Sequence, residues 1–311
     1  MVSMTCFVGA SNGRITKKPP LRSLSSSQGQ WLRARNYLAR AVTCVHLQPM
    51  RQDERIRPDE NHELRQHISV ATYNVYMDGH LAFPGNLKTA HVIAQSGADI
   101  VCLQETNRCW EKFLLEQQSV TEAYQHIRFL HHRWRHGGVA ILSKLPLGAS
   151  DLVSKEIFFG WYPAWKTSVI VDERISELEI VNLHLRAAFP SLPWKVEKQR
   201  LQEVQTHCEC LLEDQGKIPT IVLGDLNTSN ALCTRFLEQE MGLVNALSQH
   251  CSSSRTHTWH GKFLGLKLRA VYDHVFYNPA LLTCVGAEVV EAGGSDHYPL
   301  ITQFQFQPGL E

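Results

Sequence analysis

The feature that most constrains the fold is the alternation of short apolar runs with amphipathic segments from Ile68 onward. The run ADIVCLQE (98–105) contains four consecutive apolar residues, as expected of a strand that is buried on both faces. Farther along, TSVIV (167–171) and LEIVNLHL (178–185) flank the polar turn DERISE, a pattern typical of an antiparallel hairpin. Because helical crossovers are mixed with hairpins, the sequence predicts α/β layers with mixed sheets rather than a purely parallel sheet.

The helical segments support the same fold class. A helix is predicted over 87–96 and ends at Gly97, a second is predicted over 107–118, and a long helix begins at Pro193. The other predicted strands are ISVATYNV (68–75), GGVAILS (137–143), PTIVLGD (219–225), VYDHVFY (271–277) and PLITQFQF (299–306). We therefore expect one domain of about 240 residues, which spans 67–307 and is the catalytic domain of the protein.

Residues 1–66 are predicted to be a basic, largely disordered N-terminal extension. Up to residue 52 they carry eight Lys or Arg and no acidic residue, and the stretch PPLRSLSSSQGQ is typical of a loop. An Arg-rich, Ser-containing and acid-free composition also matches a mitochondrial transit segment, so a transit peptide and a disordered arm both remain open. We expect an intracellular protein, cytoplasmic, or mitochondrial if this segment is a transit peptide.

Cysteine usage and hydropathy narrow the class of protein. No uncharged apolar stretch of the sequence approaches the ~20 residues that a membrane-spanning helix needs. The nine cysteines are odd in number and form no C-x-x-C pair, which argues against a disulfide scaffold or a zinc ribbon and for a reducing compartment. We expect a soluble globular protein that acts as a monomer.

The acidic balance of the predicted domain limits how a substrate is held. Residues 53–311 contain 23 basic and 30 acidic residues, a net charge of −7. A domain that binds nucleic acid mainly through its overall field would be basic. Any anionic substrate must therefore be held by local contacts or by a bound cation.

Polar side chains gather where the apolar strands end. Rigid strands position short loops, so ligand-binding residues tend to lie at the strand ends of an α/β sheet. The group is mostly carboxylate, amide and imidazole, which indicates a hard cation with a phosphate beside it, and oxygen ligands suit Mg²⁺. The residues are Asn74, Glu105, His184, Asp225, Asn227, Asp273, Asp296 and His297.

Seven short motifs, taken in order, resemble those of the endonuclease/exonuclease/phosphatase (DNase I-like) superfamily. They are TYN (72–74), LQE (103–105), GVAILS (138–143), NLHL (182–185), GDLN (224–227), YDHVF (272–276) and SDHYPL (295–300). Each motif alone is weak, whereas the ordered set is specific. The resemblance implies a metal-dependent hydrolase of phosphoester bonds with a four-layered α/β sandwich, two mixed β-sheets flanked by helices. That fold agrees with the strands and helices predicted above.

The resemblance also implies a role for each residue near the expected cation. Glu105 would be the main Mg²⁺ ligand, with Mn²⁺ able to substitute, and Asn74 and Asp296 would belong to the same metal environment. His297 would be the general base that takes a proton from the attacking water. Asp273 would hold the other ring nitrogen of that imidazole.

Three further residues would contact the water or the phosphate. Asp225 and Asn227 would orient the water and hold a phosphate oxygen, although abasic-site enzymes give the base role to this Asp, so Asp225 and His297 compete for it. His184 would stabilise the charged transition state or help the leaving group; a lone His in such a strand would otherwise be a core residue. Tyr76 stands where abasic-site enzymes tend to carry an Asp, which argues against a dedicated abasic-site endonuclease.

Substrate contacts are expected from the loops. Arg133 and Arg135 lie in a basic aromatic loop that either grips phosphates or is a solvated turn, while Trp259 and Arg186 flank two of the motifs. We favour a phosphodiesterase that acts on nucleic acid, either a nuclease or a DNA-end-processing enzyme. The alternatives are a sphingomyelinase-like phospholipid phosphodiesterase, a small phosphate-ester phosphatase, and a catalytically dead binding protein.

Overall fold

The computed structural model describes the chain from residue 65 to residue 308 with several gaps. The described residues are 65–76, 84–132, 137–152, 162, 164–172, 175–187, 193–208, 211, 217–228, 231–250, 256–263 and 265–308. The predicted N-terminal extension therefore lies outside the described residues except for its last two positions, and Arg133 and Arg135 lie outside them too.

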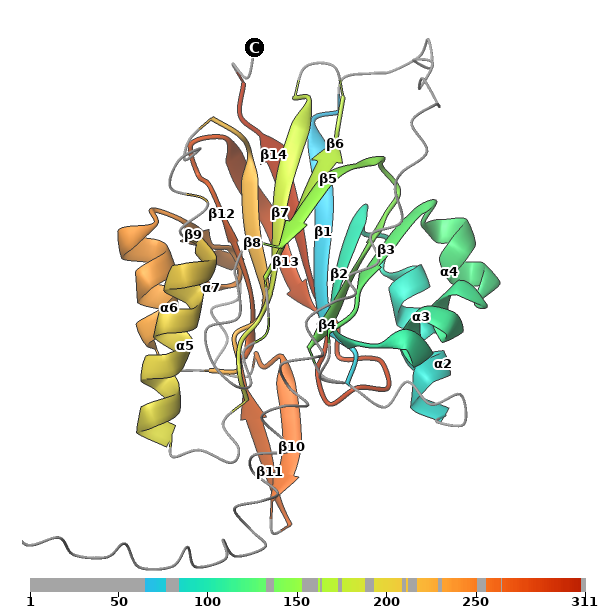
Figure 1. The fold of residues 1–311 in the computed structure, drawn as a ribbon, viewed down its shortest axis with the longest axis vertical. Helices are drawn as coiled ribbons and strands as arrows, with labels where there is room; N and C mark the ends of the chain where they lie inside the picture. The colour runs from blue at the N-terminus through green and yellow to red at the C-terminus, as the bar shows by residue number, and fades with distance from the viewer. Residues whose placement is uncertain are drawn as a thin grey trace, which may run out of the picture. The chain divides into compact units, whose positions relative to one another are not determined.

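The first of two six-stranded sheets has the parallel pair β1 and β2 at its centre (Figure 1). Its order is β13-β14-β1-β2-β4-β3, and its other neighbouring strands are antiparallel. The strands are β1 (His67–Asn74), β2 (Ile100–Thr106), β3 (His126–Leu130), β4 (Gly138–Ser143), β13 (Leu282–Val289) and β14 (Leu300–Phe306).

The second six-stranded sheet is built in the same way around the parallel pair β7 and β8. Its order is β5-β6-β7-β8-β12-β9, with antiparallel neighbours on both sides of the central pair. The strands are β5 (Leu147–Leu152), β6 (Trp165–Ile170), β7 (Glu177–His184), β8 (Thr220–Asp225), β9 (Val244–Asn245) and β12 (Asp273–Tyr277). A separate hairpin joins β10 (Trp259–Phe263) to β11 (Leu266–Ala270).

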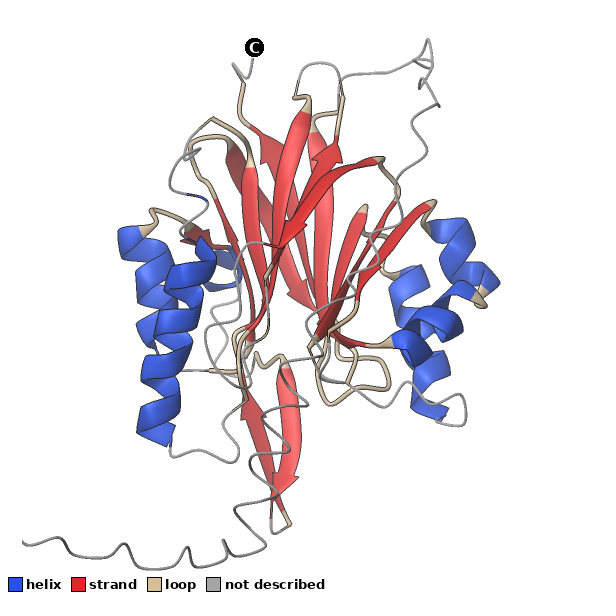
Figure 2. Ribbon diagram, in the orientation of Figure 1, coloured by secondary structure: helices blue, strands red, loops and turns tan. Residues whose placement is uncertain are grey.

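Helices cover the outer face of each sheet (Figure 2). Beside the first sheet lie α2 (Pro84–Gln95), α3 (Arg108–Leu115) and α4 (Gln118–Ala123). On the other side lie α5 (Pro193–Cys208), α6 (Ala231–Arg235), the π-helical segment η2 (Phe236–Glu240) and α7 (Ala246–His250). The layers run helix, sheet, sheet, helix, so the predicted four-layered sandwich with mixed sheets is confirmed.

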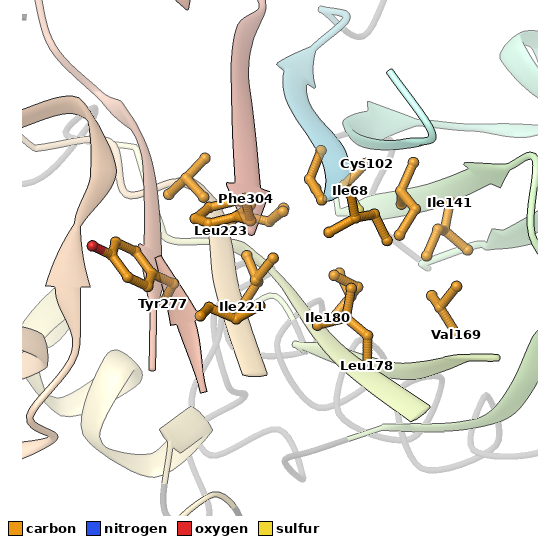
Figure 3. Close-up of a cluster of buried hydrophobic side chains, with 14 of the residues drawn as sticks. Ile68, Cys102, Ile141, Val169, Leu178, Ile180, Ile221, Leu223, Tyr277 and Phe304 are labelled. Carbon is orange, nitrogen blue, oxygen red and sulfur yellow. The ribbon is translucent and has the colours of Figure 1, made fainter. Parts of the chain in front are cut away.

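Three apolar clusters hold these layers together. The largest lies between the sheets, where Ile68 and Cys102 of the first sheet pack toward Ile180 and Leu223 of the second (Figure 3). A second cluster lies between the first sheet and its helices, and a third lies between the second sheet and its helices. The central strands are therefore buried on both faces, as the continuous apolar run of β2 predicted.

The helix predicted over 107–118 is shorter than expected: α3 ends at Leu115, and a separate helix, α4, begins only at Gln118. Asn107 caps α3 by accepting hydrogen bonds from the backbone N–H groups of Cys109 and Trp110. Gln117 then adopts an extended backbone, with φ −85° and ψ 105°, which ends the helical path before α4 begins. The buried face of α3 is Trp110, Phe113 and Leu114, which spans little more than one helical turn.

A buried polar bridge joins the two sheets near the C-terminal ends of β2 and β7. The Nε2 of Gln104 in β2 donates to Oδ1 of Asn182 in β7 at 2.8 Å. The Nδ2 of Asn182 in turn donates to the carbonyls of Leu103 at 3.1 Å and Ala140 at 3.3 Å. Since both amides are buried, these bonds fix how the sheets align next to Glu105.

The strand pairing brings the motif residues to one edge of the sandwich. Asn74 ends β1 and lies beside Gln104 of β2, while His184 ends β7 and lies beside Asp225 at the end of β8. Asp273 begins β12 opposite Asp225. None of the helices in the described part of the chain is long and apolar enough to cross a membrane.

Candidate active site

The centre of the site is the carboxylate of Asp225, which is buried at the end of β8. Its Oδ2 accepts hydrogen bonds from Nδ2 of Asn74 at 2.9 Å and from Nδ2 of Asn227 at 3.1 Å. The Nε2 atoms of His184 and His297 each lie 3.7 Å from the same oxygen. One carboxylate oxygen therefore gathers side chains from both sheets.

Glu105 enters this group through an irregularity in β2. The pairing of β2 with β4 shifts register between Gln104 and Thr106, and Glu105 adopts a φ of 59°, which is uncommon for a residue with a side chain. Its Oε1 accepts from Nδ2 of Asn74 at 3.3 Å and lies 3.8 Å from Nε2 of His184. Burial, reinforced by the charges of other acids, raises the pKa of Glu105 to about 7.

His297 and Asp273 form a buried pair next to Asp225. Nδ1 of His297 lies 2.8 Å from Oδ2 of Asp273, a hydrogen bond that fixes the ring orientation. The backbone N–H of His297 donates to Oγ of Ser295, and that of Asp273 donates to Oγ1 of Thr258. Burial alone would lower the pKa of His297, but the carboxylates of Asp273 and Asp225 outweigh it and raise the pKa to about 10.

The GDLN turn after β8 holds its polar residues in a constrained backbone. Asn227 has a φ of 53°, and its backbone N–H donates to Oδ1 of Asp225 at 2.7 Å. Its Nδ2 also donates to the carbonyl of Leu185 at 2.9 Å. Gly224 has a φ of 135°, and a Cβ there would stand 1.9 Å from the carbonyl oxygen of Leu183, so only glycine fits.

The predicted substrate contacts lie at the border of this centre. The indole Nε1 of Trp259 donates to Oδ2 of Asp296 at 2.9 Å, so those two residues form one wall. Arg186 follows β7, and its guanidinium pairs with the buried Glu203 and donates to Oε1 of Gln199. The carbonyl of Arg186 accepts from Nε of Arg200 at 2.8 Å, which further ties this turn to α5.

Sequence reasoning missed one ring in contact with the site. Tyr162 stacks on the imidazole of His184, with ring centroids 4.7 Å apart and planes inclined by 16°. His132 meets the edge of the same tyrosine at 5.8 Å. The only sequence signal was the aromatic run 158–165, which did not single out Tyr162.

The donor set fits a divalent cation. The carboxylates of Glu105, Asp225 and Asp273 are packed within one partly enclosed site, which is unfavourable unless positive charge is close. Oδ1 of Asp273 is buried with no hydrogen-bond partner among the described residues. Asp225, Asp273 and His297 can also present ligand atoms within 4.8 Å of one another. These are the oxygen and nitrogen donors that a metal ion such as Mg²⁺ or Mn²⁺ accepts.

The structure brings most of the described motif side chains close together. Asn74, Glu105, His184, Asp225 and Asn227 gather at one point, and Asp273 and His297 complete the group. Asp296 and Trp259 lie at the border, and Arg186 lies beside the site with acidic and amide partners. Arg133 and Arg135 lie outside the described residues.

The family model for the Endonuclease/Exonuclease/phosphatase family matches residues 71–297. The chain therefore belongs to this family, whose members are metal-dependent hydrolases of phosphoester bonds, and it is an enzyme of that class. No curated protein sequence matches the chain.

Solved structures with the same fold include TDP2 and Nocturnin. TDP2 from D. rerio, solved with a single-strand DNA product, is 16% identical, with 77% of this chain and 99% of that chain covered and a TM-score of 0.60. A truncated TDP2 from Caenorhabditis elegans is 19% identical, with 77% and 98% covered and a TM-score of 0.57. The human Nocturnin catalytic domain, solved with a sulfate anion, is 20% identical, with 79% and 97% covered and a TM-score of 0.57. At these identities the likeness establishes the fold.

Proposed function

We propose that this protein is a Mg²⁺-dependent phosphodiesterase that acts on nucleic acid, either as a nuclease or as a DNA-end-processing enzyme. The observation that carries the proposal is the convergence of Asn74, His184, Asn227 and His297 on one oxygen of Asp225, with Glu105 beside them. These residues come from four strand ends and two loops, and a purely structural role does not require so many polar groups at one buried point.

Glu105 and Asp296 are the carboxylates that we assign to the cation, and Asn74 orients Glu105 through its amide. The tighter group of Asp225, Asp273 and His297 is a less suitable first choice, because Asp273 and His297 already bond each other. When bound, a divalent ion supplies positive charge to the phosphate oxygens and to the leaving oxygen.

The remaining residues divide the work at the phosphate. Nδ2 of Asn227 and Nε2 of His184 lie 3.1 Å and 3.7 Å from the same oxygen of Asp225, so both can donate to oxygens of a phosphate placed beside it. Asp225, or His297 in its neutral form, accepts the proton of the attacking water, and Asp273 keeps the ring of His297 oriented in either case. We assign Arg186 to positioning the turn after His184, because its guanidinium pairs with Glu203.

Two observations support nucleic acid as the substrate. The structures with this fold include TDP2 with a single-strand DNA product. In addition, Trp259 forms a wall of the site, and the hairpin that carries it also bears Lys262, Lys267 and Arg269, a local positive charge on an otherwise acidic domain. The proposal includes a monomeric catalytic domain over 67–307 that works inside the cell.

A hydrolysis panel tests the proposal. The purified full chain is given single-stranded DNA, abasic duplex, a 5′-tyrosyl oligonucleotide, poly(A) and sphingomyelin, each with Mg²⁺, Mn²⁺ or EDTA. We expect turnover of at least one nucleic acid that EDTA abolishes and Mg²⁺ restores. Turnover of sphingomyelin alone would support the phospholipid alternative, and absence of turnover with every substrate would contradict the proposal.

Matched variants separate the site from the fold. Glu105→Gln and His297→Ala are expected to lower kcat by about 10²–10⁴-fold, the usual contribution of such groups. Glu238→Gln and His91→Ala change exposed residues of the same type outside the site and should keep full activity. All four proteins should unfold cooperatively by circular dichroism; an active Glu105→Gln protein would refute the assignment.

A further inference from the structure

Tyr76 is held in an unfavourable backbone conformation just beyond β1. Its φ is 59°, in the left-handed region that bulky residues avoid. Two contacts maintain this conformation: the backbone N–H of Tyr76 donates to Oδ1 of Asn74 at 3.0 Å, and the indole of Trp110 donates to the carbonyl of Tyr76 at 2.8 Å. Trp110 is fully buried in α3, so the strained peptide is fixed by the core and by the active site together.

Tyr76 nevertheless remains 40% exposed. It lines a cavity of about 840 Å³ whose other walls include Trp259, His260, Asp296 and Tyr298. Burial of the tyrosine ring therefore does not offset the strain of the Tyr76 backbone. Strained backbone conformations of this kind cluster at active sites and ligand clamps, which makes a function for the exposed ring a testable hypothesis.

The cavity lies between the β10–β11 hairpin and the catalytic segment. Trp259 forms a β-bridge with His297, and the backbone N–H of His260 donates to the carbonyl of Asp296 at 2.9 Å. Whatever enters the cavity thus lies next to the candidate scissile position. Lys262, Lys267 and Arg269 also line it.

The composition of these walls defines the chemistry of the occupant. Trp259 is already tilted against Tyr272 at 5.2 Å, and the edge of His260 meets Tyr298 at 4.6 Å. Aromatic walls of this kind take a flat, uncharged ring, while lysine and arginine take an anion attached to it. A nucleotide combines a planar base with a phosphate in this way.

We propose that Tyr76 is a specificity-determining residue, held in a strained backbone so that its ring stacks on the base next to the scissile phosphate. This inference rests on the proposed function and deepens it. The substrate class that it defines is a phosphodiester that carries a base beside the cleaved bond, in a single-stranded region where that base can leave its neighbours. A phosphodiester backbone without bases would lose the contact with Tyr76.

Selectivity for bases provides the first test. The substrates are oligothymidylate and an oligomer of the same length made only of tetrahydrofuran abasic residues, and the readout is the ratio of their kcat/KM values. We expect the wild-type ratio to exceed one. Tyr76→Ala should lower that ratio about 10-fold, mainly through KM for oligothymidylate, whereas Tyr76→Phe should retain it. Leu115→Ala, which removes an exposed apolar side chain of α3, is the control.

Stability provides a second test that does not depend on activity. Tyr76→Ala and Tyr76→Gly remove the same ring, but only glycine adopts a φ of 59° without strain. The glycine variant should therefore melt about 2–4 °C above the alanine variant. Equal melting temperatures would overturn the claim that a strained backbone presents the ring.

The outcomes distinguish the role of Tyr76 from the proposed phosphodiesterase function on which it rests. If the wild-type enzyme hydrolyses both oligomers equally well, or if Tyr76→Ala leaves the ratio unchanged, the role of Tyr76 is wrong while the phosphodiesterase stands. If neither oligomer is hydrolysed with Mg²⁺ or Mn²⁺, the inference about Tyr76 is overturned, whereas the nucleic-acid proposal falls only if the other nucleic acids of the hydrolysis panel are not hydrolysed either.

Discussion

Tyr162 lies flat against His184, with 4.7 Å between the ring centroids and 16° between the ring planes. The stack is itself supported, because a ring nitrogen of the buried His207 is hydrogen-bonded to the backbone of Tyr162. Gly137 also lies close: a Cβ at that position would stand 2.7 Å from the tyrosine ring. Nε2 of His184 lies 3.8 Å from Glu105 and 3.7 Å from Asp225. Tyr162, which lies outside the family motifs, therefore orients a ring that is in contact with both carboxylates.

Loss of that stack should slow catalysis. Tyr162→Leu is expected to lower kcat about 2- to 10-fold with little change in KM, because stacking contributes roughly 0.5–1.5 kcal/mol and acts through His184. Tyr162→Phe should retain kcat. In a His184→Ala background, Tyr162→Leu should have no further effect, so an additive loss in the double variant would contradict a role through His184.

The pairing of Asp273 with His297 predicts a larger effect. Asp273→Asn keeps the volume of the side chain but replaces the carboxylate that faces Nδ1 of His297, so the ring loses the charge that orients and stabilises it. We expect kcat to fall by about 10²–10⁴-fold while the unfolding transition stays cooperative. Steady-state kinetics checks the first point and thermal unfolding checks the second. Wild-type turnover in this variant would exclude the pair from catalysis.

Loss of the polar bridge between the sheets should lower the free energy of unfolding. Asn182→Leu removes the donor to the carbonyls of Leu103 and Ala140 and leaves the amide of Gln104 without its acceptor on β7. A buried group left unsatisfied costs about 1–3 kcal/mol, so the free energy of unfolding should fall by about 2–4 kcal/mol. Urea denaturation measures this change. The control is Gln239→Leu, which replaces an exposed amide on η2 by the same apolar side chain and should change stability little.

Buried His207 predicts how stability varies with pH. Burial lowers the pKa of His207 to about 3, so the folded protein keeps this ring neutral while the unfolded chain protonates it near pH 6.5. Between those values the unfolded state binds more protons, and stability therefore falls as the pH falls, by up to about 1.4 kcal/mol per pH unit from this residue. His207→Gln should reduce the slope of stability against pH between 4 and 6. An unchanged slope would mean that His207 does not titrate on unfolding.

Much of the fold could be predicted because the apolar patterning is local. The strands around 68–75, 98–105 and 219–225 each end in a polar motif residue, and rigid parallel strands bring such ends together. For that reason the proximity of Asn74 and Glu105 was accessible from the strand pattern, whereas Asp225 lies in the second sheet and joins them through the packing of the two sheets.

Other features depend on the folded chain and carry little local signal. The strand β13 was not predicted, because a register shift between Cys284 and Gly286 interrupts its alternation. The helix predicted over 107–118 ends at Leu115, before the extended residue Gln117, and helix propensity does not reveal this end. The contact of Tyr162 with His184 and the strain at Tyr76 arise from tertiary packing, which the spacing of residues along the sequence does not predict.

The position of β14 has a consequence for synthesis of the protein. This strand inserts between β13 and β1, although every other described strand precedes it along the chain. On the ribosome, β1 must therefore wait with one edge unpaired until residues 300–306 have emerged, and His297 arrives only shortly before them. Products released before that point would lack both a closed sheet and a complete set of catalytic side chains, so hydrolytic activity appears only in chains translated through this segment.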